Sequence, residues 1–386
     1  MTIDLNGAFS TDPAANVATF VKAAKAGQTL TCSKPIIVPI GAVSGQGSSG
    51  PLINLPANFR YDWQLDNLTL LTAPNQPTNA PGTSNQPACS IQFGSGAIGG
   101  DININIDGNG IHQIDTNAEN AYGFYTHGIR IWAPTGKFTG RLGIHNIRGV
   151  TSISNVDANG VGRTETFDLQ VLGGTASGHS FNVDTGSLDG SSPASGAVFQ
   201  HMSPTSQSYL KIVAKGNRHG CGVYGGGNFY VMEGSYISGT QTAVNGEAGK
   251  TGTPSITVGG VTTGDMSKLV TLEGNRYGIV INGNLQPGAA AGTSQVDLVK
   301  IQNAWFVHNA SDINLTGVIG KRVDIENCLY YDPTNTAVRF MAGSATNNAR
   351  WAKNTFHKGS MYHFTKGQKL TIGAPLVVAN GVPVAV

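Results

Sequence analysis

Short apolar segments alternate with glycine- and asparagine-rich corners along most of this chain, most regularly between residues 208 and 367. The two most similar corners read KGNRHG at residues 215–220 and EGNRYG at residues 273–278. Related corners begin at residues 233, 302, 326 and 353, and most steps between corners run from 18 to 29 residues, apart from a longer step between 233 and 273. A loose period of this size, filled with strand-like pieces, predicts a repeat architecture.

The apolar segments have the two-residue alternation of β-structure. Ile102, Ile104 and Ile106 alternate with asparagine and aspartate, for example. The sequence shows no alternation of helical and strand-like segments, which excludes a sheet built from βαβ units. Short strands joined by tight corners, at about 20 to 28 residues per turn, predict a parallel β-helix whose equivalent residues stack about 4.8 Å apart. A β-propeller would need a repeat of about 40 to 45 residues per blade, which is longer than the period of this chain, so a propeller is not predicted.

The N-terminal segment predicts one short helix, from about residue 13 to 26. Asp12 is placed to cap it, Pro13 suits its first position, and Gly27 closes it. A helix there would cover the open end of a β-stack. We therefore divide the chain into a cap (1–40), a parallel β-helix (41–369) and an apolar C-terminal tail (370–386), which we expect to pack on the stack or on a neighbouring subunit.

Composition narrows the possible partners. The chain has 53 glycines, and its charged residues make up 12%, against about 25% in ordinary domains. The net charge is +2 without a long basic or acidic run, so neither nucleic acid nor a membrane surface is predicted as a partner. No segment approaches the roughly 20 apolar residues of a membrane span. The four cysteines form no CxxC pattern and are expected to be isolated, buried thiols, with a disulfide or a metal site as the alternative.

The first candidate site consists of Glu233 and Glu273. If their corners stack in adjacent rungs, their carboxyl groups lie about 5 Å apart, close to the roughly 5 to 5.5 Å of a retaining glycosidase pair. Carboxylates this close would couple, leaving an acid beside a base. Arg218, His219 and Arg276 lie at the same corners and are candidates for substrate binding. The alternative is a solvated ladder of polar residues at a sheet edge.

A second candidate site is an acidic cluster in the irregular middle of the chain. Asp184 and Asp189 would supply an acid/base pair, with His179, Glu165 and Asp168 nearby in sequence. The alternative is that the Gly/Ser/Asp turns of this region explain the aspartates without any function.

A third cluster combines Asp107, His112, Asp115 and His127. These residue types can bind a metal or take up a proton. Their spacing matches no metal-ligand template, however, and Asp-Gly-Asn-Gly at residues 107–110 is first of all a turn. We therefore predict neither a metal site nor a cofactor.

Aromatic residues recur near the corners and have two interpretations. Stacked inside, they form the core of the β-helix; exposed on one face, they offer flat surfaces to the apolar C–H faces of sugar rings. The residues concerned are Tyr236, Tyr277, Trp305, Phe306, Tyr330, Tyr331, Phe356 and Tyr362. Trp132, between Arg130 and Lys137, is the best single candidate for a sugar contact.

The segments EGNRYGIVI (273–281) and VDIENCLY (323–330), together with the N-terminal helix, resemble the right-handed parallel β-helix proteins of the pectate-lyase-like superfamily. That group includes pectin and alginate lyases, polygalacturonases, uronan epimerases and phage tailspike depolymerases. The resemblance covers about residues 10 to 370 and implies an all-β, right-handed parallel β-helix. The polygalacturonase signatures have only partial counterparts in Gly178-His179-Ser180 and Asn182-Val183-Asp184, and the pectate-lyase signatures are absent.

The capping helix and the apolar tail look most like those of phage tailspikes. Residues 1–20 have no Lys or Arg and no apolar core, so we expect no secretory signal there; the alternative is that one has been removed. This resemblance implies a homotrimer that is virion-associated, or extracellular by a non-classical route. A cytoplasmic location is the alternative.

These observations favour an enzyme, a glycosidase or lyase that binds and cleaves a polysaccharide in a surface groove. Loops near residues 72–88, 184–196 and 248–267 interrupt the rungs, whereas a purely structural solenoid would repeat more strictly. A non-catalytic glycan-binding tailspike or adhesin, and a structural β-solenoid, are the alternatives. The identity of the sugar, and the choice between hydrolysis and β-elimination, are left open.

Overall fold

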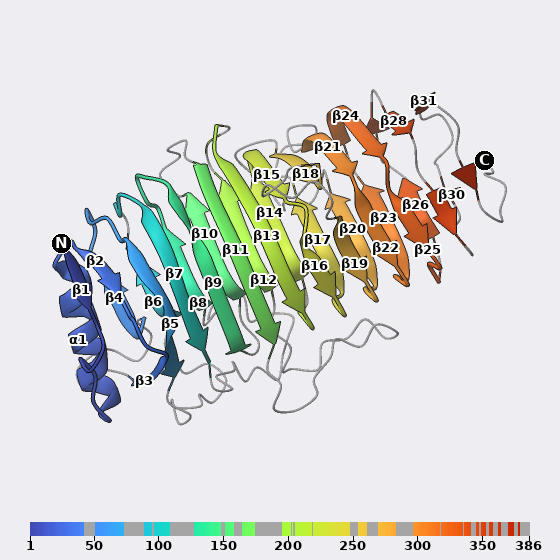
Figure 1. Cartoon of the computed structure of the whole chain (residues 1–386). Coiled ribbons are helices and arrows are strands. Elements are labelled where there is room, and N and C mark those ends of the chain that lie inside the picture. Colours follow the sequence, from blue (N-terminus) through green and yellow to red (C-terminus); the bar gives the residue numbers. More distant parts are fainter. Residues whose placement is uncertain are drawn as a thin grey trace, which may run out of the picture.

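The computed structural model confirms an all-β chain coiled into a parallel β-helix (Figure 1). It describes all residues except 42–50, 73–88, 95, 109–126, 148–150, 158–163, 174–194, 202, 204, 218, 248–253, 261–268, 283–295, 317, 335, 341–344, 347–348, 353–354, 358–361, 364–369, 374–376 and 379–386. Every strand pairing within this part is parallel. Each turn of the chain adds one rung to two long sheets, which we call sheet A and sheet B.

Sheet A begins with short strands, continues with long single strands, and in its later rungs divides into two strands per rung. Its first strands are β1 (Thr2–Asp4), β2 (Thr29–Thr31), β3 (Ile36–Ile40), β5 (Trp63–Thr72), β7 (Gly100–Asp107), β9 (Phe138–Ile147), β11 (Thr164–Gly173) and β13 (Gln207–Lys215). Later rungs carry two shorter strands each: β15 (Gly227–Val231) with β16 (Tyr236–Ser238), β18 (Pro254–Val258) with β19 (Val270–Glu273), β21 (Val296–Gln302) with β22 (Ala304–Val307), and β24 (Val318–Glu326) with β25 (Leu329–Tyr331).

The last turns of sheet A continue the same pattern. They are β27 (Ala345–Thr346), β28 (Ala349–Ala352), β29 (Thr355–His357), β31 (Leu370–Gly373) and β32 (Val377–Val378). β31 pairs with β28 and β32 pairs with β29, so these two described strands add a further rung to the stack.

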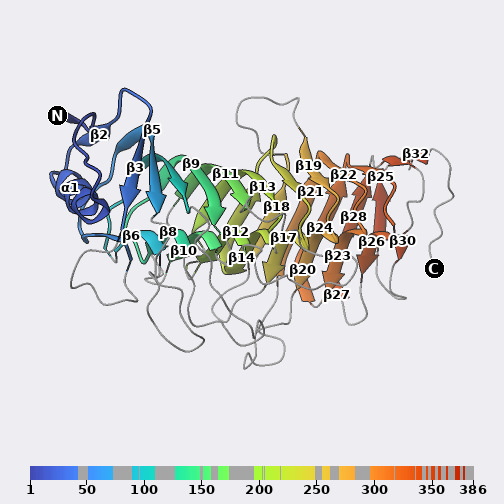
Figure 2. The same cartoon turned by 90° about the horizontal axis from the view of Figure 1, so that it is seen from below.

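Sheet B takes one strand from each turn. Its strands are β4 (Ile53–Leu55), β6 (Cys89–Phe93), β8 (His127–Trp132), β10 (Thr151–Asp157), β12 (Ser195–His201), β14 (His219–Gly225), β17 (Thr242–Glu247), β20 (Tyr277–Asn282), β23 (Ser311–Thr316), β26 (Thr336–Phe340) and β30 (Tyr362–His363). Figure 2 shows sheets A and B running the length of the molecule together.

The predicted N-terminal helix is confirmed as α1 (Pro13–Lys25), which lies across the first rungs (Figure 1). The Asp12 carboxylate accepts a hydrogen bond of 3.0 Å from the backbone N–H of Ala14, which caps the helix. Its buried face includes Phe20, whose ring packs edge-on against Trp63 at 5.2 Å. No helix within the described residues is long and apolar enough to span a membrane.

The core is the inside of the coil, where alternate residues of each strand stack from rung to rung. Phe199 packs on Phe229 at 5.4 Å, and Phe306 stacks on Tyr330 at 5.0 Å between ring centres. The residues between these inward positions point outward. In β7 the buried Ile102 and Ile104 alternate with Asn103, which belongs to the outer face.

The corner residues that we treated as one series belong to two different corners, which corrects the sequence interpretation. Residues 215 and 273 end β13 and β19, before the chain turns into sheet B. Residues 233, 302 and 326 instead lie at the bend between the two sheet A strands of a rung. Position 353 lies outside the described residues.

The turn from sheet A into sheet B is held by left-handed backbone and buried amides. Gly274, at φ 62°, donates its N–H to the carbonyl of Val307 in the next rung. The buried Asn275 donates its side-chain N–H to Asn309 (3.0 Å) and accepts the hydroxyl of Thr240 (2.8 Å). The recurring Gly-Asn pair is therefore architectural: glycine tolerates the positive φ, and asparagine satisfies buried polar groups across rungs.

Candidate functional site

A column of polar side chains crosses the outer face of sheet A in the N-terminal half. Strand register aligns Gln64, Asn103, Arg141, Asp168 and Lys211 on five successive rungs, from β5, β7, β9, β11 and β13. Because residues opposite one another in a parallel sheet are about 4.8 Å apart, these side chains form one continuous surface.

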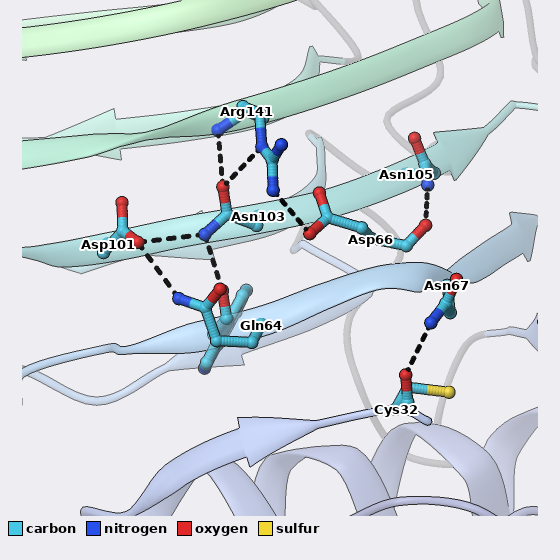
Figure 3. A network of polar contacts seen from close by, with 9 residues as sticks. Cys32, Gln64, Asp66, Asn67, Asp101, Asn103, Asn105 and Arg141 are labelled. Atoms are coloured by element: carbon cyan, nitrogen blue, oxygen red, sulfur yellow. Dashed lines mark hydrogen bonds and ion pairs between the residues drawn. The ribbon is translucent and has the colours of Figure 1, made fainter. Parts of the chain in front are cut away.

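Asn103 holds the centre of this column (Figure 3). It is only 4% exposed although it faces outward. Its amide N–H groups donate to the carbonyl of Trp63 (3.1 Å) and to the carboxylate of Asp101 (3.0 Å), and its oxygen accepts the backbone N–H of Arg141 (3.0 Å). One amide therefore ties three rungs together.

Asp101 lies beside Asn103 and is held in its charged form. Its carboxylate accepts hydrogen bonds from Gln64 (3.0 Å), Asn103 (3.0 Å) and Thr139 (2.8 Å). Burial by itself would raise the pKa of Asp101. These hydrogen bonds and the charge of Arg141 outweigh burial, so that its pKa lies below the ordinary value. Asp101 is therefore an ionised acceptor at neutral pH.

Two ion pairs complete the polar surface. The guanidinium of Arg141 lies 2.9 Å from the carboxylate of Asp66, and the ammonium of Lys211 lies 3.2 Å from that of Asp168. All four side chains are partly exposed, so each pair adds little to stability. Their hydrogen-bonding groups remain accessible to a ligand.

This surface is hollowed into an open groove of about 560 Å³. Its lining residues are Gln64, Asp101, Asn103, Thr139, Gly140, Arg141, Thr166, Phe167, Asp168, Lys211 and Met232. At its C-terminal end Tyr209 and Tyr230 stack face to face, 4.4 Å apart and 5° from parallel. Both tyrosines are in register with Thr166.

The stacking predicted for Glu233 and Glu273 is wrong. The residue opposite Glu273 in the preceding rung is Ser238, whereas Glu233 lies before β16 at the other corner. Glu233 is 3% exposed and accepts a hydrogen bond of 2.9 Å from Asn303. A buried carboxylate that binds a corner amide has little access to a polymer.

Glu273 lies on the outer face, within a different polar cluster. Its carboxylate accepts a hydrogen bond of 2.6 Å from the hydroxyl of Tyr236. This bond, together with burial, raises the pKa of Tyr236, which stays a donor. The ammonium of Lys215 lies 5.5 Å from the centre of the Tyr236 ring.

The predicted substrate-binding residues are divided between two places. Arg276 and His219 lie where the chain enters sheet B, and His219 is linked by register through Thr242 to Tyr277. Arg276 contacts the Tyr277 ring at 5.3 Å. Trp132, at the end of β8, lies nearer the N-terminus, with the guanidinium of Arg130 over its ring at 4.6 Å.

Several predicted residues lie outside the described part of the chain: Arg218, Asp184, Asp189, His179, His112 and Asp115. Of the second cluster, Asp168 lies in the groove, while the buried Glu165 accepts a hydrogen bond of 3.2 Å from Ser208.

The third cluster is divided by the fold. Asp107 ends β7 in sheet A, whereas His127 begins β8 in sheet B. Asp107 is instead in register with His145. Burial lowers the pKa of His145, and the charge of Asp107 raises it to a smaller extent. The described residues contain no group of three or more His, Cys, Asp or Glu side chains that could hold a metal.

The structure separates the aromatic residues into two groups. Phe306 and Tyr330 are buried in the core, as the first interpretation predicted. Trp305 and Tyr331 are exposed on sheet A, as the second predicted. The described free cysteines, Cys32, Cys221 and Cys328, are buried.

Sequence reasoning missed most of the groove. Gln64, Asn103 and Arg141 belong to period-two strands, and their outward positions were readable from that alternation. The register between strands decides which outward residues become neighbours. Loops of unequal length separate the strands, so this register cannot be read from spacing along the sequence. The amide-rich outer face of β7 was the clearest local signal.

No model of a known protein family matches the sequence, and no curated protein matches it. Among solved structures, the Azotobacter vinelandii mannuronan C-5 epimerase AlgE6 A-module is similar over 98% of this chain and 98% of its own, at 13% identity and a TM-score of 0.43. Bacteriophage CBA120 tailspike protein 3 is similar over 98% of this chain and 61% of its own, at 12% identity and a TM-score of 0.23. The strand pairing establishes that this chain is a parallel β-helix, the fold of the pectate-lyase-like proteins that its sequence resembles.

Proposed function

We propose that the groove on sheet A binds an extended polysaccharide. The observation that carries this proposal is the column from Gln64 to Lys211, in which hydrogen-bonding side chains from five successive rungs line one open groove. A polymer with a repeating set of hydroxyl groups meets donors and acceptors at each rung.

The chemistry of the groove suits sugar hydroxyl groups, which both donate and accept hydrogen bonds. Gln64 offers an amide, Asp101 a charged acceptor, and Arg141 and Lys211 charged donors. Each of these side chains is held by neighbours before a ligand arrives, which lowers the entropy cost of binding.

The charges in the groove favour a neutral polysaccharide. Arg141 and Lys211 are matched by the groove carboxylates Asp101 and Asp168, and Asp66 adds a further negative charge beside Arg141. The groove therefore offers no positive excess to attract a polyanion.

Affinity electrophoresis in gels containing galactomannan, hydroxyethylcellulose, alginate or polygalacturonate tests the proposal. We expect retardation by a neutral polymer, and weaker retardation after Arg141→Ala. Arg322→Ala is the matched control, because it also removes a surface arginine that pairs with an aspartate, Asp324, on a distant rung of sheet A. The proposal fails if no polymer retards the protein, or if Arg141→Ala behaves like Arg322→Ala.

Cleavage of the bound polysaccharide is the second proposal, with Asp101 and Asp168 as the carboxylates. Register places them two rungs and two residues apart, about 12 Å between Cα atoms. From there their side chains can approach the roughly 6.5 to 9.5 Å of an inverting pair. The ionised Asp101 would act as the base, with Asp168 as its partner carboxylate.

Release of reducing ends from the neutral polysaccharide measures cleavage. We expect Asp101→Asn and Asp168→Asn to stop product release while retaining binding. Continued release by both variants contradicts this assignment. The homotrimer and the virion-associated or extracellular location remain predictions, and sedimentation of the purified chain tests the former.

A further inference from the structure

Two large aromatic side chains are exposed next to each other on the outer face of sheet A, outside the lining of the groove. Trp305 on β22 is 42% exposed and Tyr331 on β25 is 40% exposed. Trp305 is opposite Leu329 in the next rung, two residues before Tyr331. This register puts the two aromatic Cα atoms about 8 Å apart.

Polar groups lie beside these rings. Glu273, on the rung before Trp305, is in register with Val307, and Tyr236 donates to its carboxylate. The ring of His308, the residue after Val307, packs edge-on against Tyr331 at 5.1 Å, and its Nδ1 lies 3.6 Å from the carboxylate of Asp332. We call Trp305, Tyr331 and these polar neighbours the aromatic platform.

We propose that the aromatic platform is a second carbohydrate-binding site, at which Trp305 and Tyr331 stack on the pyranose rings of a neutral polysaccharide. Sugar rings combine an apolar C–H face with a rim of hydroxyl groups, which matches exposed rings beside fixed acceptors such as Glu273. A protein-binding surface would instead need a desolvated apolar centre. This inference rests on the proposed polysaccharide function and extends it to a new site.

The platform continues the path of the groove. Lys211, Val213 and Lys215 all point outward from β13. Lys211 lines the groove and Lys215 contacts the Tyr236 ring of the platform. The two lysines are about 13 Å apart along one strand. The two sites are therefore linked through β13 and the contact of Lys215 with Tyr236.

The test is affinity electrophoresis of the full chain in galactomannan and hydroxyethylcellulose gels, with alginate as the anionic comparison. We expect Trp305→Ala to weaken binding of a neutral polymer about tenfold, a loss typical of a contact tryptophan. Trp305→Phe keeps a ring and is expected to stay within about threefold of the parent. Ile37→Ala is the control, because Ile37 is a 67% exposed apolar residue on β3 of the same sheet, far from the platform. Far-ultraviolet circular dichroism verifies the fold of each variant.

The outcomes separate the two proposals. If Arg141→Ala weakens binding while Trp305→Ala behaves like Ile37→Ala, the platform inference is wrong and the groove proposal stands. If Trp305→Ala weakens binding while Arg141→Ala does not, the platform stands and the groove proposal is wrong. If neither neutral polymer is bound, both proposals are wrong. Binding of alginate alone also overturns the platform inference.

Discussion

Replacing Asn103 by alanine tests whether the groove is held by its central amide. The substitution removes three hydrogen bonds of ordinary length, to Trp63, Asp101 and the backbone N–H of Arg141. The distance between the Arg141 Nε and the Asn103 oxygen is 3.5 Å, which is too long for this contact to contribute comparably to stability. At about 1 kcal/mol of net stability per hydrogen bond, the expected loss in the free energy of unfolding is about 3 kcal/mol.

Asn105→Ala is the matched control, because Asn105 has the same side chain on the same outer face of β7. Its amide makes one hydrogen bond, to the carbonyl of Asp66, and lies in a more exposed position. The expected loss for Asn105→Ala is about 1 kcal/mol or less. The two variants should therefore differ by about 2 kcal/mol in the free energy of unfolding.

Urea unfolding followed by far-ultraviolet circular dichroism measures this difference through the transition midpoints. The comparison of two midpoints is safer than either absolute value, because stacked repeats can unfold in more than one step. Equal midpoints for Asn103→Ala and Asn105→Ala would refute the reasoning that burial and inter-rung bonding give Asn103 its weight. Asn103→Ala should also weaken polysaccharide binding, because it frees Asp101 and Arg141.

Three further outcomes are expected. The pKa of Asp101 is lower in the folded protein than its unfolded value near 3.8. Its ionised form therefore contributes stability that is fully present above pH 3.8 and is lost as the pH falls through the folded pKa. Asp101→Asn should then flatten the fall of the urea midpoint below about pH 4. Gly140→Ala should prevent folding or lower the free energy of unfolding by more than about 3 kcal/mol, because the new Cβ would lie 1.8 Å from the carbonyl oxygen of Ile102. Gly7→Ala is the control: at φ 70° in open space it should lower the free energy of unfolding by only about 1 kcal/mol, measured by thermal or urea unfolding. Asn275→Ala removes four buried side-chain hydrogen bonds and should cost about 4 kcal/mol by urea unfolding. A loss below about 1 kcal/mol contradicts the architectural role of the Gly-Asn corner.

The fold could be predicted because its signals are local. Alternation such as that of Ile102, Ile104 and Ile106 reflects the pleat of a strand, which places successive side chains on opposite faces wherever the strand lies. The helix at Pro13–Lys25 was equally readable, because Asp12 supplies its cap from the neighbouring residue. Such features need no information about distant parts of the chain.

The candidate site depended on distances along the coil, and there the sequence misled. Glu233 and Glu273 both begin or precede a glycine corner, yet one lies at the bend within sheet A and the other at the turn into sheet B. A corner motif records a local backbone conformation, such as the positive φ of Gly234 and Gly274. It does not record which of the two corners of a rung the motif occupies.

The sequence by itself determined that the chain forms stacked parallel strands with an apolar interior, because periodicity and turn residues act over a few positions. Only the tertiary structure decided which outward residues meet. Gln64, Asn103 and Arg141 become neighbours through strand register across intervening loops, and Trp305 reaches the surface while Phe306, the next residue, enters the core. Register is set by packing between rungs and by the length of each loop, and both are properties of the whole coil.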